Sequence, residues 1–206
     1  MKFILGLKKN MSQVFDASGV AYPATIITAG PVTVTQIKAV ETDGYAAVQV
    51  GFGSTKAEKL SKPQKGHLKE IGAFPTLKEF RLPKEQVSTL KVGDKIDLST
   101  FAVGDAVEVS AVSKGKGFQG VVKRHGFHGG PRSHGQKHSE REPGSISGGT
   151  REGGRVPAGM RMAGRMGSDR ITVKNQKIVH VDVAAGEIYI EGAVPGKRGT
   201  LVEIRG

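Results

Sequence analysis

The stretch that organises this chain opens Ser113-Lys114-Gly115-Lys116-Gly117-Phe118-Gln119-Gly120 and closes Arg161-Met162-Ala163-Gly164-Arg165-Met166-Gly167. Between these ends, over residues 113–167, glycine and basic residues recur every few positions. The apolar residues follow neither the period of a helix nor, beyond Val122, the period of a strand. We therefore expect the stretch not to fold on itself. A structureless segment this long indicates that something outside the protein orders it.

The charge of this stretch indicates what that partner is. Only Glu140, Glu142 and Glu152 oppose the basic residues. The basic residues are Lys114, Lys116, Lys123, Arg124, Arg132, Lys137, Arg141, Arg151, Arg155, Arg161 and Arg165. Such an excess favours a dense polyanion as the partner. Glycine also allows the backbone to approach a phosphate chain closely. We interpret residues 113–167 as an arm that threads folded RNA.

The composition of the whole chain agrees with a nucleic-acid binder. The 206 residues carry 31 Lys and Arg against 19 Asp and Glu, a formal charge of +12. No apolar run reaches the roughly 18 residues of a membrane-spanning helix, and the start lacks the pattern of a secretory signal. The chain has no cysteine, which fits a reducing cytosol and removes disulfides and thiolate metal sites. We expect no membrane partner.

The residues on either side of the arm read as short strands separated by turns. The β-branched and alternating segments are residues 3–7, 11–15, 20–27, 32–38, 45–52, 95–98, 103–112, 171–173, 177–183, 187–191 and 200–204. A hairpin turn is expected at Ala184-Ala185-Gly186. This pattern predicts an antiparallel sheet or barrel that the chain leaves at Val112 and rejoins at Ile171.

Residues 53–84 differ from the strands around them. They carry Lys56, Lys59, Lys62, Lys65 and Lys69 near Pro63 and Gly66, and a short helix is expected near residues 67–71. We interpret this segment as an insertion. A solvated surface excursion and a second rRNA-facing patch both remain open for it.

Several motifs contain residue types that are also found in cofactor-binding or catalytic sites. The glycine spacing of Gly115-Lys116-Gly117-Phe118-Gln119-Gly120 resembles a dinucleotide fingerprint, but no acidic residue follows at the required distance, and no Walker-type loop is present. The same run shares a single aromatic with an RNA-recognition-motif strand. Ser133-His134 and Ser139-Glu140 supply residue types for nucleophilic chemistry without a spacing that orients a base. We therefore expect neither catalysis nor a small-molecule substrate.

Four histidines of the arm raise the question of a metal site. They are His125, His128, His134 and His138. No cysteine joins them, and the neighbouring cations would repel a metal ion. Hydrogen bonding or stacking on RNA is the favoured use. Met160, Met162 and Met166 are expected to pack at the root of the arm.

The order of motifs along the whole chain resembles the bacterial form of the ribosomal protein L three family, a universal family of the large subunit. The weaker matches are Gly6-Leu7-Lys8 with Met11-Ser12, Val34-Thr35-Gln36-Ile37-Lys38, Asp43-Gly44-Tyr45-Ala46-Ala47-Val48-Gln49, Lys62-Pro63 with Gly66-His67, and Glu79-Phe80-Arg81. The specific ones are Ser113-Lys114-Gly115-Lys116-Gly117-Phe118, Lys123-Arg124, Ser133-His134-Gly135, Pro143-Gly144-Ser145-Ile146, Arg161-Met162-Ala163-Gly164-Arg165-Met166-Gly167 and Gly192-Ala193-Val194-Pro195-Gly196.

This resemblance implies a mainly β fold: a six-stranded barrel like those of translation factors, with a small α-containing insertion and a long extended basic arm. The barrel domain would comprise residues 1–112 and 168–206, with the insertion at about 53–84, and the arm residues 113–167. The implied function is that of a non-enzymatic constituent of the large ribosomal subunit. It would bind large-subunit rRNA directly and early, help nucleate subunit assembly, contact neighbouring ribosomal proteins, and send the arm towards the peptidyl-transferase centre.

No cofactor is expected beyond Mg²⁺ associated with the rRNA. The residues predicted to bind rRNA are Lys8, Lys9, Lys114, Lys116, Phe118, Lys123, Arg124, His125, Arg132, His134, Lys137, His138, Arg141, Arg151, Arg155, Arg161 and Arg165. The alternatives are an architectural protein that binds DNA or RNA outside the ribosome, and a nucleotide-using or metal-dependent RNA-modifying enzyme. Preference for duplex DNA would distinguish the first, and cofactor binding the second.

Two positions depart from the family pattern. Asn10 stands where the family usually has glycine before Met11, which is tolerable because asparagine also visits the left-handed region. Residues 147–153, Ser-Gly-Gly-Thr-Arg-Glu-Gly, replace a glutamine-containing run of bacterial relatives. The glutamine that some relatives methylate therefore has no counterpart here.

Overall fold

The computed structural model describes residues 2–16, 18–68, 71–146 and 153–206. The chain divides into two compact units. The first comprises Met1–Val112 and Arg170–Gly206 and is called the barrel unit here. The second, Ser113–Asp169, is called the basic unit. None of the helices in the described ranges is long and apolar enough to cross a membrane.

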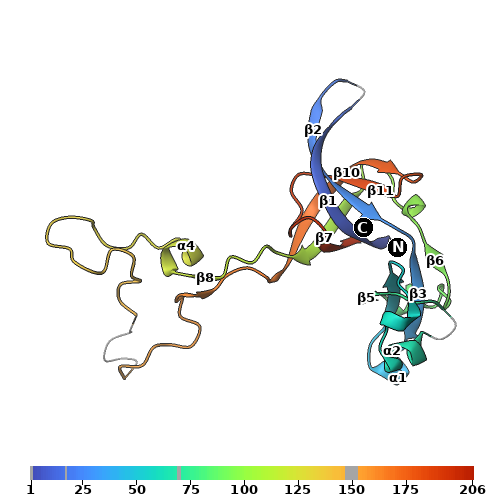
Figure 1. Ribbon diagram of the computed structural model, residues 1–206, viewed down its shortest axis with the longest axis horizontal. Coiled ribbons are helices and arrows are strands. Elements are labelled where there is room, and N and C mark those ends of the chain that lie inside the picture. Colours follow the sequence, from blue (N-terminus) through green and yellow to red (C-terminus); the bar gives the residue numbers. More distant parts are fainter. Residues whose placement is uncertain (1, 17, 69–70, 147–152) are drawn as a thin grey trace. The chain divides into compact units, whose positions relative to one another are not determined.

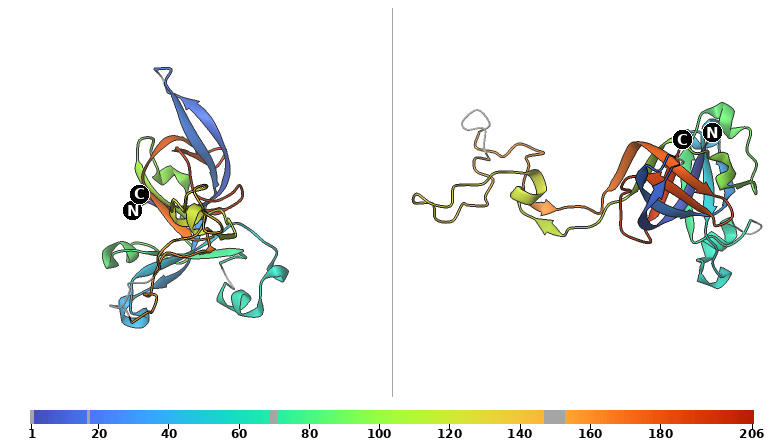
Figure 2. Two further views of the ribbon diagram at one scale, coloured as in Figure 1. Left: turned by 90° about the vertical axis from the view of Figure 1, so that its left-hand side faces the viewer. Right: turned by 90° about the horizontal axis from the view of Figure 1, so that it is seen from above.

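Six antiparallel strands close the barrel (Figures 1 and 2). In spatial order they are β1 (Phe3–Phe15), β12 (Leu201–Arg205), β7 (Ala106–Val112), β10 (Arg170–Asp182), β11 (Glu187–Glu191) and β2 (Ala21–Ala29). Closure leaves no open edge, which is how a small antiparallel sheet satisfies its backbone donors and acceptors. The predicted six-stranded barrel is confirmed.

Close packing inside the barrel requires a glycine on β1. Gly6 pairs with Val202 on β12 and with Ala29 on β2. A Cβ atom at Gly6 would lie only 2.5 Å from Cγ2 of Ile27. Any larger side chain here would therefore push β1 and β2 apart.

The barrel unit also contains a four-stranded sheet in the order β5 (Thr76–Arg81), β4 (Ala47–Phe52), β3 (Val32–Lys38) and β6 (Lys95–Ile96). The two sheets share one hydrophobic core, in which Phe3 of β1 stacks on Phe80 of β5 with ring centroids 4.4 Å apart. Both rings are almost fully buried. The core thus fixes the sheet against the barrel.

Residues 53–84 contain a short helix and a strand, which corrects the expected helix position near residues 67–71 and adds a strand that the sequence did not predict. The helix, α2, spans Lys62–His67, and strand β5 follows it. The Gln64 side chain accepts a hydrogen bond from the backbone of Ser61 at 3.2 Å, which satisfies an otherwise unpaired donor at the start of α2. The other short helical segments of this unit are α1 (Val40–Asp43), η1 (Ala57–Lys59), α3 (Lys84–Val87) and η2 (Leu98–Thr100).

The outer half of the β1–β2 hairpin extends beyond the barrel (Figure 1). Its register shifts between Lys8 and Met11, so Asn10 lies in a bulge. Asn10 does not adopt a positive φ, so the left-handed conformation expected for it is wrong. At the tip, Asp16 Oδ1 accepts hydrogen bonds from the backbone N–H groups of Ser18 and Val20, both at 2.9 Å. These bonds close the turn.

Strand β10 was predicted as two strands, at residues 171–173 and 177–183, and is a single one. Its register against β7 shifts between Val173 and Gln176. Asn175 at this shift has a φ of 55°, a left-handed conformation that asparagine tolerates. The predicted turn at residues 184–186 is confirmed, with Gly186 at a φ of 66°.

The described residues of the basic unit contain the short elements β8 (Phe118–Gln119), α4 (Val121–His125) and β9 (Gly164–Arg165). Strands β8 and β9 pair with each other although residues 120–163 separate them, with Phe118 opposite Arg165 and Gln119 opposite Gly164. The expectation that residues 113–167 do not fold on themselves is therefore wrong at the root of this unit. The rest of its described residues carry no helix or strand.

Candidate nucleic-acid interface

The root of the basic unit is a small packed structure. Val121 of α4 is buried, and the helix ends at Gly126, which has a φ of 72° and caps it in the left-handed conformation. Next to it, the Arg124 guanidinium donates a hydrogen bond to the Met162 carbonyl at 2.7 Å, and His125 Nε2 lies 3.0 Å from the same oxygen. The returning chain is thereby tied to α4. Met162 and Met166 are partly buried here, and Met160 is exposed.

Two glycines allow the two legs of the basic unit to touch. A Cβ atom at Gly167 would lie 2.2 Å from the Lys114 carbonyl oxygen, and one at Gly129 would lie 2.0 Å from the Glu140 carbonyl oxygen. Both glycines also have a positive φ. Some glycines of this segment are thus needed for contacts of the chain with itself, in addition to the approach to phosphate expected from the sequence.

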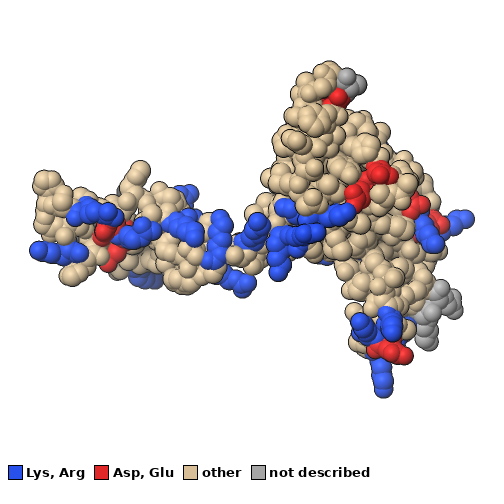
Figure 3. Space-filling model, turned by 45° about the horizontal axis from the view of Figure 1, so that its top comes forward, with Lys and Arg blue, Asp and Glu red and all other residues tan. Residues whose placement is uncertain are grey.

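The cations of the basic unit lie on its surface (Figure 3). Eight of them are exposed and form no ion pair with any residue in the described ranges. They are Lys114, Lys116, Lys123, Lys137, Arg141, Arg155, Arg161 and Arg165. His134 and His138 are exposed as well. Exposed and uncompensated, these side chains are available to phosphate groups at little desolvation cost.

Other predicted site residues form contacts with other residues of this protein. Arg132 pairs with Glu140 at 2.8 Å, and Arg124 and His125 contact Met162 as described. In the barrel unit, Lys8 Nζ donates to the carbonyls of Val194 and Gly196 at 2.6 and 3.1 Å, and Lys9 pairs with Glu187 at 2.6 Å. Arg151 lies outside the described residues, as does most of the run that replaces the methylated glutamine.

Aromatic surface is present beside these cations. The Phe118 side chain on β8 is 76% exposed, and no other described residue of this chain covers it. Such exposure is unusual for phenylalanine, because contact of its apolar ring with water is unfavourable. His125 and Phe127 lie with ring centroids 5.9 Å apart. Together with Gln136 and Arg161 they line a pocket of about 580 Å³ in the basic unit. Unstacked RNA bases stack on aromatic rings and on guanidinium planes of this kind.

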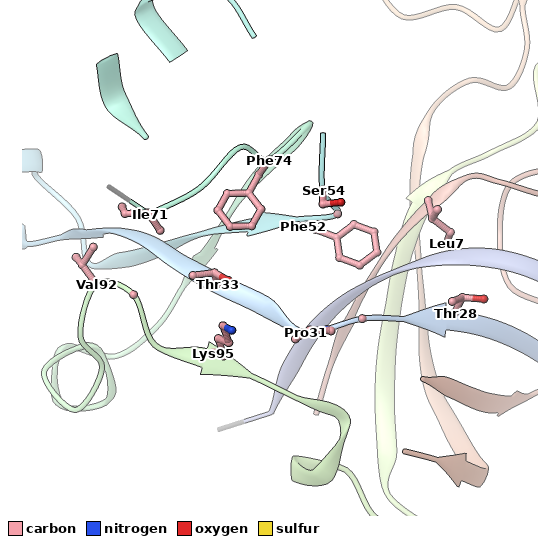
Figure 4. A pocket seen from close by; sticks show the side chains of 13 residues that line it. Leu7, Thr28, Pro31, Thr33, Phe52, Ser54, Ile71, Phe74, Val92 and Lys95 are labelled. Atoms are coloured by element: carbon pink, nitrogen blue, oxygen red, sulfur yellow. The ribbon is translucent and has the colours of Figure 1, made fainter. Parts of the chain in front are cut away.

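The features of an enzyme site are not found in the described part of the chain. No group of three or more His, Cys, Asp or Glu side chains comes together there to hold a metal ion. A pocket of about 860 Å³ lies in the barrel unit (Figure 4). Its lining is mostly apolar, with Phe52, Phe74 and Val92 among its side chains, and Lys95 is its one ionisable residue. A lone exposed lysine supplies no acid–base pair.

Sequence reasoning missed one group of cations in the barrel unit. Lys78, Arg81, Arg170 and Arg205 come from three strands and line one polar pocket. Their separation along the chain leaves no local signal, and only the fold brings them together.

A closed β-barrel and a glycine-rich unit with eight exposed cations that form no ion pair in the described ranges are typical of the class of protein that binds nucleic acid. Comparisons with known proteins specify the family. Residues 84–188 match the family model described as ribosomal protein L3.

Among curated proteins, the chain is 46% identical over 201 residues to large ribosomal subunit protein uL3 of Herpetosiphon aurantiacus, covering 98% of this chain and 94% of that protein. It is 47% identical over 203 residues to large ribosomal subunit protein uL3c of Paulinella chromatophora, covering 98% and 91%. It is 43% identical over 205 residues to uL3 of Cutibacterium acnes, covering 100% and 92%. The chain belongs to the ribosomal protein L3 family.

Proposed function

We propose that this chain is a structural constituent of the large ribosomal subunit and binds large-subunit rRNA directly, with the basic unit as its main contact. The observation that carries this is the set of eight exposed lysines and arginines of the basic unit without an ion pair in the described ranges. The family supports the same reading, since its relatives are named as large-subunit proteins. The family is one of structural proteins, and we assign the chain no enzymatic activity.

The binding mechanism we infer is electrostatic and steric. Each lysine or arginine that meets a phosphate releases a condensed counterion, and that release favours the complex. The basic unit has a small packed root and little core beyond it, so RNA contacts must offset the loss of conformational freedom in its loops. In this proposal the barrel fixes the position of the chain in the subunit, and the basic unit fills and neutralises crevices between RNA helices.

The finer parts of the proposal follow from the family. We infer that the chain binds rRNA early, helps nucleate subunit assembly in the cytoplasm, and sends residues 113–167 towards the peptidyl-transferase centre. Neighbouring ribosomal proteins are further partners. The outer β1–β2 hairpin is a candidate surface for them, because the chain has no Lys or Arg between Lys9 and Lys38, and Met11, Phe15 and Val20 are each half exposed or more.

A binding assay tests this proposal. The full chain is titrated onto a transcript of the large-subunit rRNA of Herpetosiphon aurantiacus, and onto duplex DNA of matched length at the same salt. We expect tighter binding to the folded rRNA, with affinity that falls steeply with salt. Equal or tighter binding to the duplex DNA would favour an architectural DNA-binding protein and contradict the proposal.

A further inference from the structure

A second, polar pocket of the barrel unit has an excess of positive charge. Its volume is about 480 Å³, and it lies where β5 of the four-stranded sheet meets β10 and β12 of the barrel. Its charged lining consists of four cations, Lys78, Arg81, Arg170 and Arg205, and two carboxylates, Glu79 and Glu203. The lining therefore carries a net charge of +2, in a part of the chain where the sequence predicted no site.

Both carboxylates of the pocket are already paired. Glu203 forms ion pairs with Arg170 at 2.5 Å and with Lys78 at 3.2 Å. Desolvation by burial raises the pKa of Glu203, but the hydrogen bonds from Arg170 and Lys78 outweigh it, and the pKa lies below its ordinary value. Glu79 pairs with Lys38 at 2.8 Å, outside the pocket lining, and accepts a hydrogen bond from Tyr45. Neither carboxylate forms an ion pair with the remaining two cations of the lining, Arg81 and Arg205.

Those two arginines, Arg81 and Arg205, are held by aromatic rings. The Arg81 guanidinium carbon lies 4.8 Å from the centre of the Tyr45 ring, and that of Arg205 lies 5.0 Å from the centre of the Phe80 ring. Neither forms an ion pair within the described ranges. A guanidinium that lies over a ring keeps its N–H groups directed outward at its edge.

The rings themselves have little freedom. Phe80 is 1% exposed and stacks on Phe3, and the Tyr45 hydroxyl is fixed by its bond to Glu79 at 2.8 Å. Two guanidinium groups thus lie over ordered rings beside an open pocket, and neither has an anionic partner among the described residues. Contact with an ordered ring lowers the side-chain entropy that each arginine loses when it binds an anion.

We propose that this pocket binds a phosphodiester group of folded RNA, with Arg81 and Arg205 as its principal donors. The guanidinium fork matches the spacing of two phosphate oxygens, and the net positive lining favours a group that stays ionised at neutral pH. RNA is favoured over an acidic protein segment because the whole chain has a charge of +12 and belongs to a family of ribosomal proteins. The proposal rests on the proposed function and adds to it a contact on the barrel itself.

Salt titration of the full chain tests the site. The probe is the same rRNA transcript, and the variant carries Arg81→Gln with Arg205→Gln. Because both arginines engage one phosphodiester group, the slope of log affinity against log salt should flatten by about 0.7 to 0.9 units. The matched control carries Lys91→Gln with Lys177→Gln, two exposed lysines of the barrel unit outside the pocket, and should keep the wild-type slope. A variant slope equal to that of wild type overturns the proposal and leaves the proposed function standing. Absence of rRNA binding by the wild type overturns both.

Two further measurements exclude a merely structural effect. Arg81→Lys with Arg205→Lys keeps both charges, so it should retain the slope even if loss of the forks lowers affinity. Phenylglyoxal modification of the wild type, mapped by mass spectrometry, should label both arginines in the free chain and neither in the complex. Equal labelling with and without the transcript contradicts the proposal. Protection that requires added large-subunit proteins and is not given by the transcript also contradicts it, because the occupant would then be a protein carboxylate.

Discussion

Replacing Arg161 and Arg165 together by glutamine should flatten the salt dependence of rRNA binding. Both side chains are exposed and form no ion pair with the described residues, so their loss removes no known support from the basic unit. Arg165 pairs with Phe118 through the strand backbone, and glutamine preserves that pairing. The change should therefore report on phosphate contacts and not on folding.

The expected size follows from counterion release. Each cation that neutralises a phosphate adds about 0.7 to 0.9 to the slope of log affinity against log salt, so two should add about 1.5. Between 50 and 200 mM salt, a slope difference of that size lowers the ratio of wild-type to variant affinity by about eightfold. A base-reading role would differ, since loss of a bidentate base contact costs about 1 to 3 kcal/mol and relaxes sequence preference at one position.

The assay is filter binding of both proteins to one rRNA fragment at a series of salt concentrations. Arg161→Lys with Arg165→Lys is the control that keeps the charges, and its slope should match the wild type. Barrel melting should be the same in all three proteins, because both positions lie in the basic unit. An unchanged slope in the glutamine variant would refute direct phosphate engagement by these arginines.

Three other outcomes follow from the structure. Phe80→Ala should lower the free energy of unfolding of the barrel by about 3 to 5 kcal/mol in urea titration, since the buried ring stacks on Phe3, and a loss below about 1 kcal/mol would contradict that packing. Although burial raises the pKa of Glu203, its ion pairs with Arg170 and Lys78 lower the pKa below its ordinary value. Their contribution to stability is therefore complete above the ordinary pKa of 4.5 and is lost as the pH falls through the lower pKa of the folded state. The difference in melting temperature between wild type and Glu203→Gln should therefore shrink from pH 7 to pH 3, and a constant difference would be inconsistent. Limited proteolysis of the free chain should cut mainly between residues 123 and 165 and stop on addition of rRNA, whereas uniform resistance without RNA would show that this segment is ordered by itself.

Much of the barrel unit was predictable because most of its strands carry local signals. Alternation and β-branched residues placed the segments at 32–38 and 187–191 on the strands β3 and β11, and turn residues marked the hairpin at Gly186. Strand β5 was missed because Leu77 and Phe80 lie on opposite faces of a strand, so Thr76–Arg81 has no single apolar face in its sequence. Helix α4 was missed because five residues are too few to show a helical period.

The candidate interface was predictable in composition and not in its contacts. The excess of charge in residues 113–167 is visible in the sequence, but pairing of β8 with β9 joins residues far apart and has no local signature. For the same reason nothing indicated that Arg124 would donate to the Met162 carbonyl or that Lys8 would donate to Val194. Convergence of Arg81 and Arg205 on one pocket likewise depends on the packing of β5 against β12.

The central claim is that the basic unit supplies most of the affinity for rRNA, and a deletion tests it most directly. Replacing residues 127–161 by a short Gly-Ser linker keeps α4 and the β8–β9 pairing. It removes six cations, Arg132, Lys137, Arg141, Arg151, Arg155 and Arg161, of which Arg132 pairs with Glu140. Salt titration on the rRNA transcript should then show a slope smaller by about 4 units than that of the full chain, with barrel melting unchanged. A deletion protein that folds and binds with the full-length slope and affinity would contradict the account.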